Sequence, residues 1–179
     1  MWGRDAVLLA AVGAVPAALG GLVSFFWRAR RVPQEGAARL AFLDGLVLAS
    51  LIGIAVIGLR PGLGETPDWQ QWNFVPFREV IESLSEPDWV IQIAFANLLG
   101  NVLIYVPWGV VASFRFRRVG ILLFLVVTVA ISLSIEIAQA LEATGRVSDV
   151  TDVIMNTLGG GAAYTVARVI AARRSQPTA

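Results

Sequence analysis

Residues that could bind a ligand or carry a proton are concentrated between positions 132 and 161 of the sequence. Carboxylates, amides and one guanidinium lie within or between two long apolar runs there: Glu136, Gln139, Arg146, Asp149, Asp152 and Asn156. An ionisable side chain inside an apolar segment of membrane length is costly, and such residues usually face other helices or water at a functional site. We therefore expect a polar site in this stretch.

The chain contains neither Cys nor His. This composition excludes disulfides, thiolate catalysis and Cys-based metal sites. A general base would have to be a carboxylate, for example Glu136 or Asp152, and a metal would need oxygen ligands. A pair of carboxylates without a nucleophile motif does not decide whether the protein is an enzyme. No metal and no cofactor are predicted.

The composition is that of an integral membrane protein, because 56% of the 179 residues are hydrophobic and only 15% are charged. Crossing the hydrocarbon core takes about 20 apolar residues. Five runs meet this requirement: Ala6–Trp27, Leu40–Leu59, Val90–Ala112, Val119–Leu141 and Val153–Ala172. We predict an all-α membrane protein with a bundle of about five transmembrane helices.

The distribution of Arg predicts the orientation. All fourteen basic residues are Arg, and nine of them cluster at 28–39, at 115–118 and at 173–174. With five spans these clusters share one side, which the positive-inside rule assigns to the cytoplasm. We therefore expect a multi-pass protein of the plasma membrane, with its N-terminus outside and its C-terminus inside. Because topology explains the Arg clusters, no nucleic-acid partner is predicted.

The first two spans have the pattern of packing helices. Small residues recur at helical spacing in each, including Gly20 in the first and Gly45 in the second, and such stripes let helices approach closely. Asp44 is interpreted as a helix cap or a partner of Arg39. Trp108 is interpreted as an interfacial anchor of the third span. The predicted units are residues 1–60 with two helices, residues 61–172 with the polar site, and a tail at 173–179.

A short amphipathic helix is predicted in the outer loop. Phe77, Val80, Ile81 and Leu84 have the spacing of an apolar face, whereas Arg78, Glu79, Glu82 and Ser83 should face away from it. Pro76 suits a first helical turn and Pro87 suits the end of the helix. The segment is too short to span a membrane. It should lie on the outer membrane surface or cover the outer mouth of the bundle.

The third span adds Asn97 and Asn101, which lie one helical turn apart. With a rise of ~1.5 Å per residue, Asn97, Glu136 and Asn156 should lie roughly 5–10 Å below the outer membrane surface. Polar groups of three spans therefore converge at a similar depth. The amides could be structural hydrogen-bond partners between helices, and Glu136 could pair with Arg146. The functional alternative is an outward-facing polar pocket.

Four blocks of sequence resemble the VanZ-like family. They are Asn73 with Pro76–Phe77, then NLLGNVLIYVPWG (97–109), SLSIEIAQ (132–139) and GRVSDVTDVIMNTLGG (145–160). The family is named for a bacterial membrane protein that raises resistance to the lipoglycopeptide teicoplanin. The resemblance implies a helical VanZ-like domain. Its signature residues correspond to Asn97, Asn101, Glu136, Gln139, Arg146, Asp149, Asp152, Asn156 and Gly159.

Three classes of function fit these observations. The protein could bind an amphiphilic or lipid-linked envelope molecule, or a lipoglycopeptide, in its outward-facing pocket. It could be an intramembrane enzyme that acts on an envelope lipid through Glu136 and Asp152. It could also be a small transporter or lipid-flipping unit, although the polar residues occupy only the outer half and no internal repeat is present. We favour the first class, with membrane lipids as partners. The oligomeric state stays open.

Overall fold

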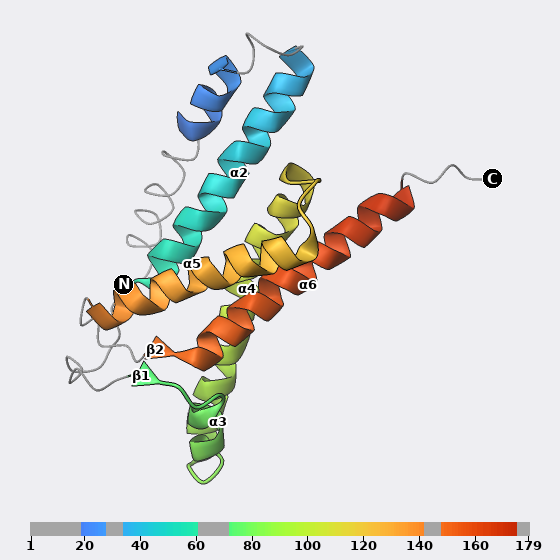
Figure 1. Cartoon of the computed structure of the whole chain (residues 1–179). Coiled ribbons are helices and arrows are strands. Elements are labelled where there is room, and N and C mark those ends of the chain that lie inside the picture. The colour runs from blue at the N-terminus through green and yellow to red at the C-terminus, as the bar shows by residue number, and fades with distance from the viewer. Residues whose placement is uncertain (1–18, 28–33, 61–71, 142–147, 175–179) are drawn as a thin grey trace.

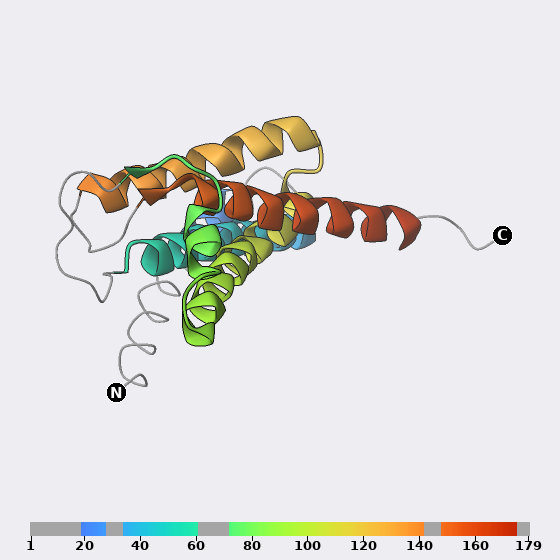
Figure 2. The same cartoon turned by 90° about the horizontal axis from the view of Figure 1, so that it is seen from below.

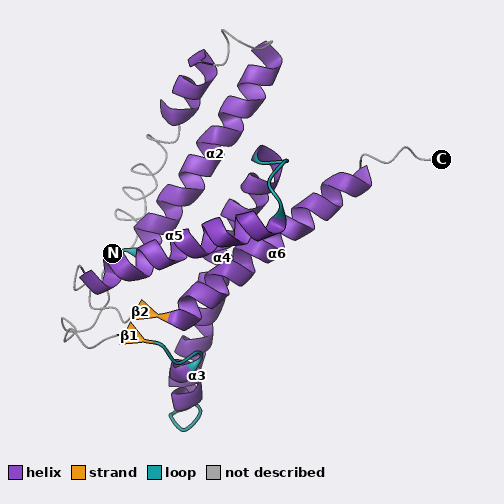
Figure 3. Cartoon of the chain, in the orientation of Figure 1, coloured by secondary structure: helices purple, strands orange, loops and turns teal. Residues whose placement is uncertain are grey.

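The computed structural model describes residues 19–27, 34–60, 72–141 and 148–174 (Figure 1). Residues 19–27 are helical and are followed by α2 (Gln34–Gly58), β1 (Trp72–Asn73), α3 (Arg78–Ser83), α4 (Asp88–Arg115), α5 (Ile121–Leu141), β2 (Ser148–Asp149) and α6 (Val150–Arg174). The described chain is mostly helical, and β1 and β2 form one short parallel ladder (Figure 3). The prediction of a helical protein is confirmed.

Three of the described helices are long and apolar enough to cross a membrane: Gly36–Gly58, Asp88–Arg115 and Ile121–Ala140. They correspond to the second, third and fourth predicted spans. Helix α6 has 25 residues but is not among them. Asp152, Asn156 and a run of three glycines lower its hydropathy. Most of the first predicted span lies at positions 1–18, outside the described residues, so the first and last spans remain predictions.

The second to fifth predicted segments each correspond to one described helix, namely α2, α4, α5 and α6. Helix α4 is longer than predicted, because it begins at Asp88 directly after Pro87 and continues to Arg115. Helix α6 begins three residues before the predicted start, at Val150. The reason is a cap: the Asp149 side chain accepts a 2.7 Å hydrogen bond from the backbone N–H of Thr151 in the first turn of α6.

Helices α4 and α6 form the closest helix contact of the bundle. A Cβ placed on Gly159 would lie 2.2 Å from the carbonyl oxygen of Val102, and one on Gly109 would lie 2.2 Å from that of Gly160. The contacting residues advance in the same direction along both helices, so α4 and α6 have the same N-to-C direction through the bundle. They cross at these glycines, and α6 extends beyond the crossing towards the C-terminus (Figure 2). Only glycine permits this approach.

An aromatic core lies just beyond the glycine contact. The rings of Trp108 and Phe124 stack at 5.7 Å, and those of Phe124 and Tyr164 at 4.1 Å. Trp108 also donates a 3.0 Å hydrogen bond from Nε1 to Oγ1 of Thr128. The interpretation of Trp108 as an interfacial anchor is wrong, because its side chain points into the bundle and is 4% exposed.

Helix 19–27 packs against α2, as the small residues indicated. A Cβ on Gly21 would lie 3.3 Å from the carbonyl oxygen of Ala41. Asp44 is not a helix cap and does not pair with Arg39, contrary to the sequence interpretation. It lies within α2, where its carboxylate forms an ion pair with Arg115 of α4 and accepts a 2.5 Å hydrogen bond from Ser24. Asp44 thus joins three helices.

Candidate functional site

A small polar cavity lies where α2, α4, α5 and α6 meet. Its volume is about 30 Å³. Its apolar lining comes from Ile54, Ile57, Gly58, Ile104 and Ile135. Its polar lining comes from Asn101, Tyr105, Glu136, Gln139, Asp152 and Asn156. Five of the eight residues predicted as a site are therefore brought together around one cavity.

Hydrogen bonds between helices fix the polar lining. Asn101 of α4 donates from Nδ2 to the Asp152 carboxylate at the start of α6. Asn156 donates to Ser132 of α5 over 2.8 Å. Gln139 donates over 2.6 Å to the carbonyl oxygen of Gly58 at the end of α2. The amides thus connect helices, as the structural alternative predicted, while they also line the cavity.

Glu136 is the most buried carboxylate of the site, with only 4% of its surface exposed. Its Oε2 accepts a 3.0 Å hydrogen bond from the backbone N–H of Asp149, and its carbonyl oxygen accepts a 2.6 Å bond from Ser148 Oγ. Both donors belong to β2. Glu136 therefore holds the start of α6 against the end of α5, and its carboxylate also faces the cavity.

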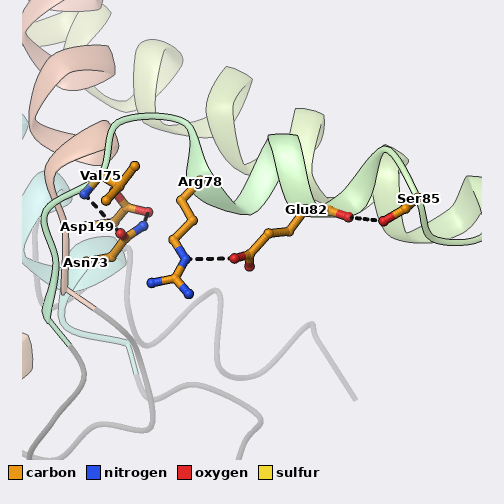
Figure 4. Close-up of polar contacts among 6 residues, drawn as sticks. All are labelled: Asn73, Val75, Arg78, Glu82, Ser85 and Asp149. Atoms are coloured by element: carbon orange, nitrogen blue, oxygen red, sulfur yellow. Dashed lines mark hydrogen bonds and ion pairs between the residues drawn. The ribbon is translucent and has the colours of Figure 1, made fainter.

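Asp149 lies beside the cavity and does not line it. One carboxylate oxygen caps α6 through Thr151, and the other accepts a 2.8 Å hydrogen bond from Nδ2 of Asn73 in β1 (Figure 4). The ladder pairs Trp72 with Ser148 and Asn73 with Asp149. Phe77 adds a third link by donating its backbone N–H to Thr151 Oγ1 over 2.8 Å. These contacts attach the segment before α3 to the start of α6.

The segment from residue 72 to residue 84 presents an apolar surface next to the site. Its large apolar side chains are exposed: Trp72, Phe74, Val75, Phe77, Ile81 and Leu84. This exposure favours the placement of α3 on a membrane surface over its placement as a cover. One detail of the predicted pattern is wrong: Ser83 is buried, because α3 packs against α4 on that side.

On the polar side of α3, Arg78 donates from Nε to Glu82 over 2.7 Å (Figure 4). This hydrogen bond and the negative charge of Glu82 raise the pKa of Arg78 above its usual value. Both side chains are more than half exposed, with exposed fractions of 57% and 63%. The pair therefore contributes little to stability.

Two other predicted site residues are not part of the cavity. Asn97 is exposed, and its Nδ2 lies 3.5 Å from Glu79 of α3. It shares a helix face with Asn101, but α4 extends past the start of α6 at this point, so α6 does not cover it. Arg146 lies outside the described residues.

Sequence reasoning missed Tyr105, which lines the cavity one turn after Asn101. Its spacing of one helical turn from Asn101 was the signal that could have identified it. Within the described part of the chain, the Tyr105 hydroxyl and Asn156 Oδ1 are buried without a hydrogen-bond partner. Buried polar atoms without partners are rare, and a cavity of this size has room for water or one small polar group. The described residues contain no group of three acidic side chains that could hold a metal ion.

Chemically, the cavity offers two carboxylates, from Glu136 and Asp152, in a lining that also contains amides, a tyrosine and isoleucines. Such a site can accept hydrogen bonds from a polar group and can relay a proton between carboxylates.

Comparison with known proteins gives two matches. Residues 45–171 match a family model described as VanZ/LLP1. A segment of 66 residues is 38% identical to Protein VanZ of Enterococcus faecium. That alignment covers 37% of this chain and 40% of the relative, so it spans less than half of either protein. No solved structure matches the chain.

Proposed function

Because the chain belongs to the VanZ/LLP1 family, we propose that it is a cell-membrane protein that binds the polar part of an amphiphilic envelope molecule at the cavity between Glu136 and Asp152. The ligand class is a lipid-linked envelope precursor or a lipoglycopeptide of the teicoplanin type. In this proposal the cavity faces the outer leaflet, and binding contributes to tolerance of teicoplanin.

One observation carries the proposal. Polar side chains from three helices converge on a single cavity, together with Gly58 at the end of α2, in an otherwise apolar bundle. A cavity of about 30 Å³ holds one small polar group and not a complete head group. We therefore propose that the ligand inserts a single hydroxyl, amide or ammonium group between Asn101, Glu136 and Asp152, where it replaces water.

The surroundings of the cavity suit an amphiphile. The exposed apolar side chains of residues 72–84 lie on a segment that is bonded to the first turn of α6. Asp152, which lines the cavity, belongs to the same turn. An apolar chain can lie along this surface while its polar end enters the cavity. Teicoplanin has an acyl chain and vancomycin has none, so such a site would distinguish the two drugs.

The test is expression in a sensitive Gram-positive host, with minimal inhibitory concentrations measured for both drugs. We expect tolerance to teicoplanin to increase more than tolerance to vancomycin. Glu136→Gln and Asp152→Asn, at matched membrane levels, should each reduce that difference. Ser134→Ala is the control, because Ser134 lies on the exposed face of α5 and bonds only to the Ala130 carbonyl within the described chain.

Unchanged teicoplanin tolerance, with verified protein in the membrane, would contradict the resistance part of the proposal. Mass spectrometry of lipids that copurify with the protein tests the binding part separately. The wild-type protein should retain an envelope amphiphile that Glu136→Gln loses. If both proteins carry the same lipids, the cavity is not the binding site.

A second candidate function rests on the finding that Glu136 and Asp152 line the same cavity. In an enzyme, one carboxylate would act as a general base and the other as a general acid on an envelope lipid. This function predicts a lipid product that appears with the wild-type protein and is absent with either amide variant. Binding without turnover predicts that no such product forms.

A further inference from the structure

A second cavity lies at the opposite end of the bundle and is rich in arginine. Its volume is about 530 Å³. Residues of the start of α2, the end of α4 and the loop that follows α4 line it, among them Arg39, Arg115, Arg117 and Arg118. Arg115 lies 14 residues after Asn101, which corresponds to about 21 Å along α4. This cavity, here called the arginine cavity, is therefore distinct from the site proposed above.

Most of the positive charge of the arginine cavity has no acidic partner within the described chain. Four of its lining residues are Arg and none is acidic. Arg115 is paired with Asp44. Arg39, Arg117 and Arg118 have exposed side chains and form no ion pair with any described residue. Three arginines that form no ion pair with a described residue thus line one hollow.

The loop that carries Arg117 and Arg118 is held in place by α6. Tyr164 donates from its hydroxyl to the carbonyl oxygen of Val119 over 2.6 Å, and Arg168 donates to that of Arg117 over 2.8 Å. The backbone N–H groups of Phe116 and Val119 donate further hydrogen bonds, to the carbonyl oxygens of Ala112 and Phe116. A fixed loop lowers the entropy cost of binding. The positive-inside rule accounts for arginines at this end, but it requires neither a hollow nor a fixed loop.

We propose that the arginine cavity binds a phosphate-bearing anion through Arg39, Arg117 and Arg118. Guanidinium groups present a planar fork of N–H donors that matches phosphate oxygens, and all basic residues of this chain are Arg. The remaining lining is largely apolar, with Leu40, Leu43 and Phe114 among it. A phosphate with acyl chains satisfies both kinds of lining, so an anionic phospholipid is the favoured source over free phosphate.

The experiment measures binding to the full-length protein in detergent, with phosphatidylglycerol, phosphatidylcholine and inorganic phosphate as probes and native mass spectrometry as readout. Arg39→Gln/Arg118→Gln removes two positive charges from the cavity. The matched control, Arg173→Gln/Arg174→Gln, removes the same charge from exposed positions in the last turn of α6. We expect the cavity variant to bind phosphatidylglycerol about thirtyfold more weakly than the control, since each of the two basic residues near an anionic lipid contributes about 1 kcal/mol.

Each outcome bears on the proposal. Selective loss of phosphatidylglycerol binding in the cavity variant supports a lipid site, and the same pattern with inorganic phosphate supports a soluble anion. Equal weakening in both variants, or no preference for phosphatidylglycerol over phosphatidylcholine together with no phosphate binding, overturns the proposal. If the double variant does not fold, Arg117→Gln is a milder second variant. It keeps the backbone carbonyl oxygen of residue 117, which accepts a hydrogen bond from Arg168.

Discussion

Asn73 and Asp149 lie 76 positions apart in the sequence, yet the Asn73 amide donates a 2.8 Å hydrogen bond to the Asp149 carboxylate. The second oxygen of that carboxylate caps α6 through Thr151. The backbone N–H of Asp149 in turn donates to Glu136. One aspartate therefore connects the segment before α3, the end of α5 and the start of α6.

The first prediction concerns this connection. Asp149→Ala should lower the free energy of unfolding by about 1–2 kcal/mol, because it removes a helix cap and the bond to Asn73. Asn73→Ala should cost less, because the cap remains. Thermal unfolding in detergent is the measurement. Ser85→Ala is the control, since Ser85 is exposed and donates only to the Glu82 carbonyl within the described chain. The double variant should cost less than the sum of its parts, and strict additivity would argue against direct coupling.

The second prediction concerns the contact between α4 and α6. Gly159→Ala should destabilise the protein by roughly 1–3 kcal/mol, because the new methyl group overlaps the Val102 carbonyl. Gly53→Ala and Gly100→Ala should be neutral or stabilising, because nothing lies within 4 Å of a Cβ there and alanine favours helix over glycine. Melting temperatures of the three variants test this contrast. A Gly159→Ala protein as stable as wild type would show that the helices do not approach so closely.

The third prediction compares two ion pairs. The side chains of Arg115 and Asp44 are only 19% and 23% exposed, whereas those of Arg78 and Glu82 are 57% and 63% exposed. Asp44→Ala leaves a half-buried guanidinium without this partner and also removes the bond to Ser24. It should therefore cost more stability than Glu82→Ala, because an exposed ion pair contributes little. The measurement is thermal unfolding at low and high salt. Similar costs for the two variants would show that Asp44 does not hold the three helices together.

The helices were largely predictable from the sequence, because apolar runs of membrane length depend on local composition. The burial of Glu136, Gln139 and Asn156 was also predictable, since each breaks such a run on the face that must avoid lipid. The partners of Asp44 were not. Two candidate cations, Arg39 and Arg115, were compatible with its charge, and only the packing of α4 against α2 selects Arg115.

The remaining differences have the same origin in tertiary packing. Asn97 and Asn101 are equivalent by helical spacing, but α6 covers only the second. Tryptophan is common at membrane interfaces, but the burial of Trp108 depends on the space that Gly160 leaves beside it. The pairing of β1 with β2 involves two residues from each strand, which is too short for a recognisable strand pattern.

The fourth prediction concerns orientation. Since the chain has no Cys, single cysteines can be introduced and labelled without background. Asp68→Cys and Gly145→Cys should react with an impermeant reagent on intact cells. Gln34→Cys and Phe116→Cys should react only after permeabilisation, because the positive-inside rule assigns these positions to the cytoplasm. Labelling of Phe116→Cys on intact cells would reverse the orientation and would place the polar cavity on the cytoplasmic side.

The glycine-rich contact between α4 and α6 also bears on biosynthesis. Helix α6 is the last described helix to leave the ribosome, and it is less apolar than the three candidate spans. Its Asp152, Asn156 and glycines are poorly suited to lipid but fit α4 and α5, which the translocon has already received. We expect α6 to enter the membrane only when these earlier helices are present to receive it. The nascent chain would then acquire its polar cavity in the same step that completes insertion.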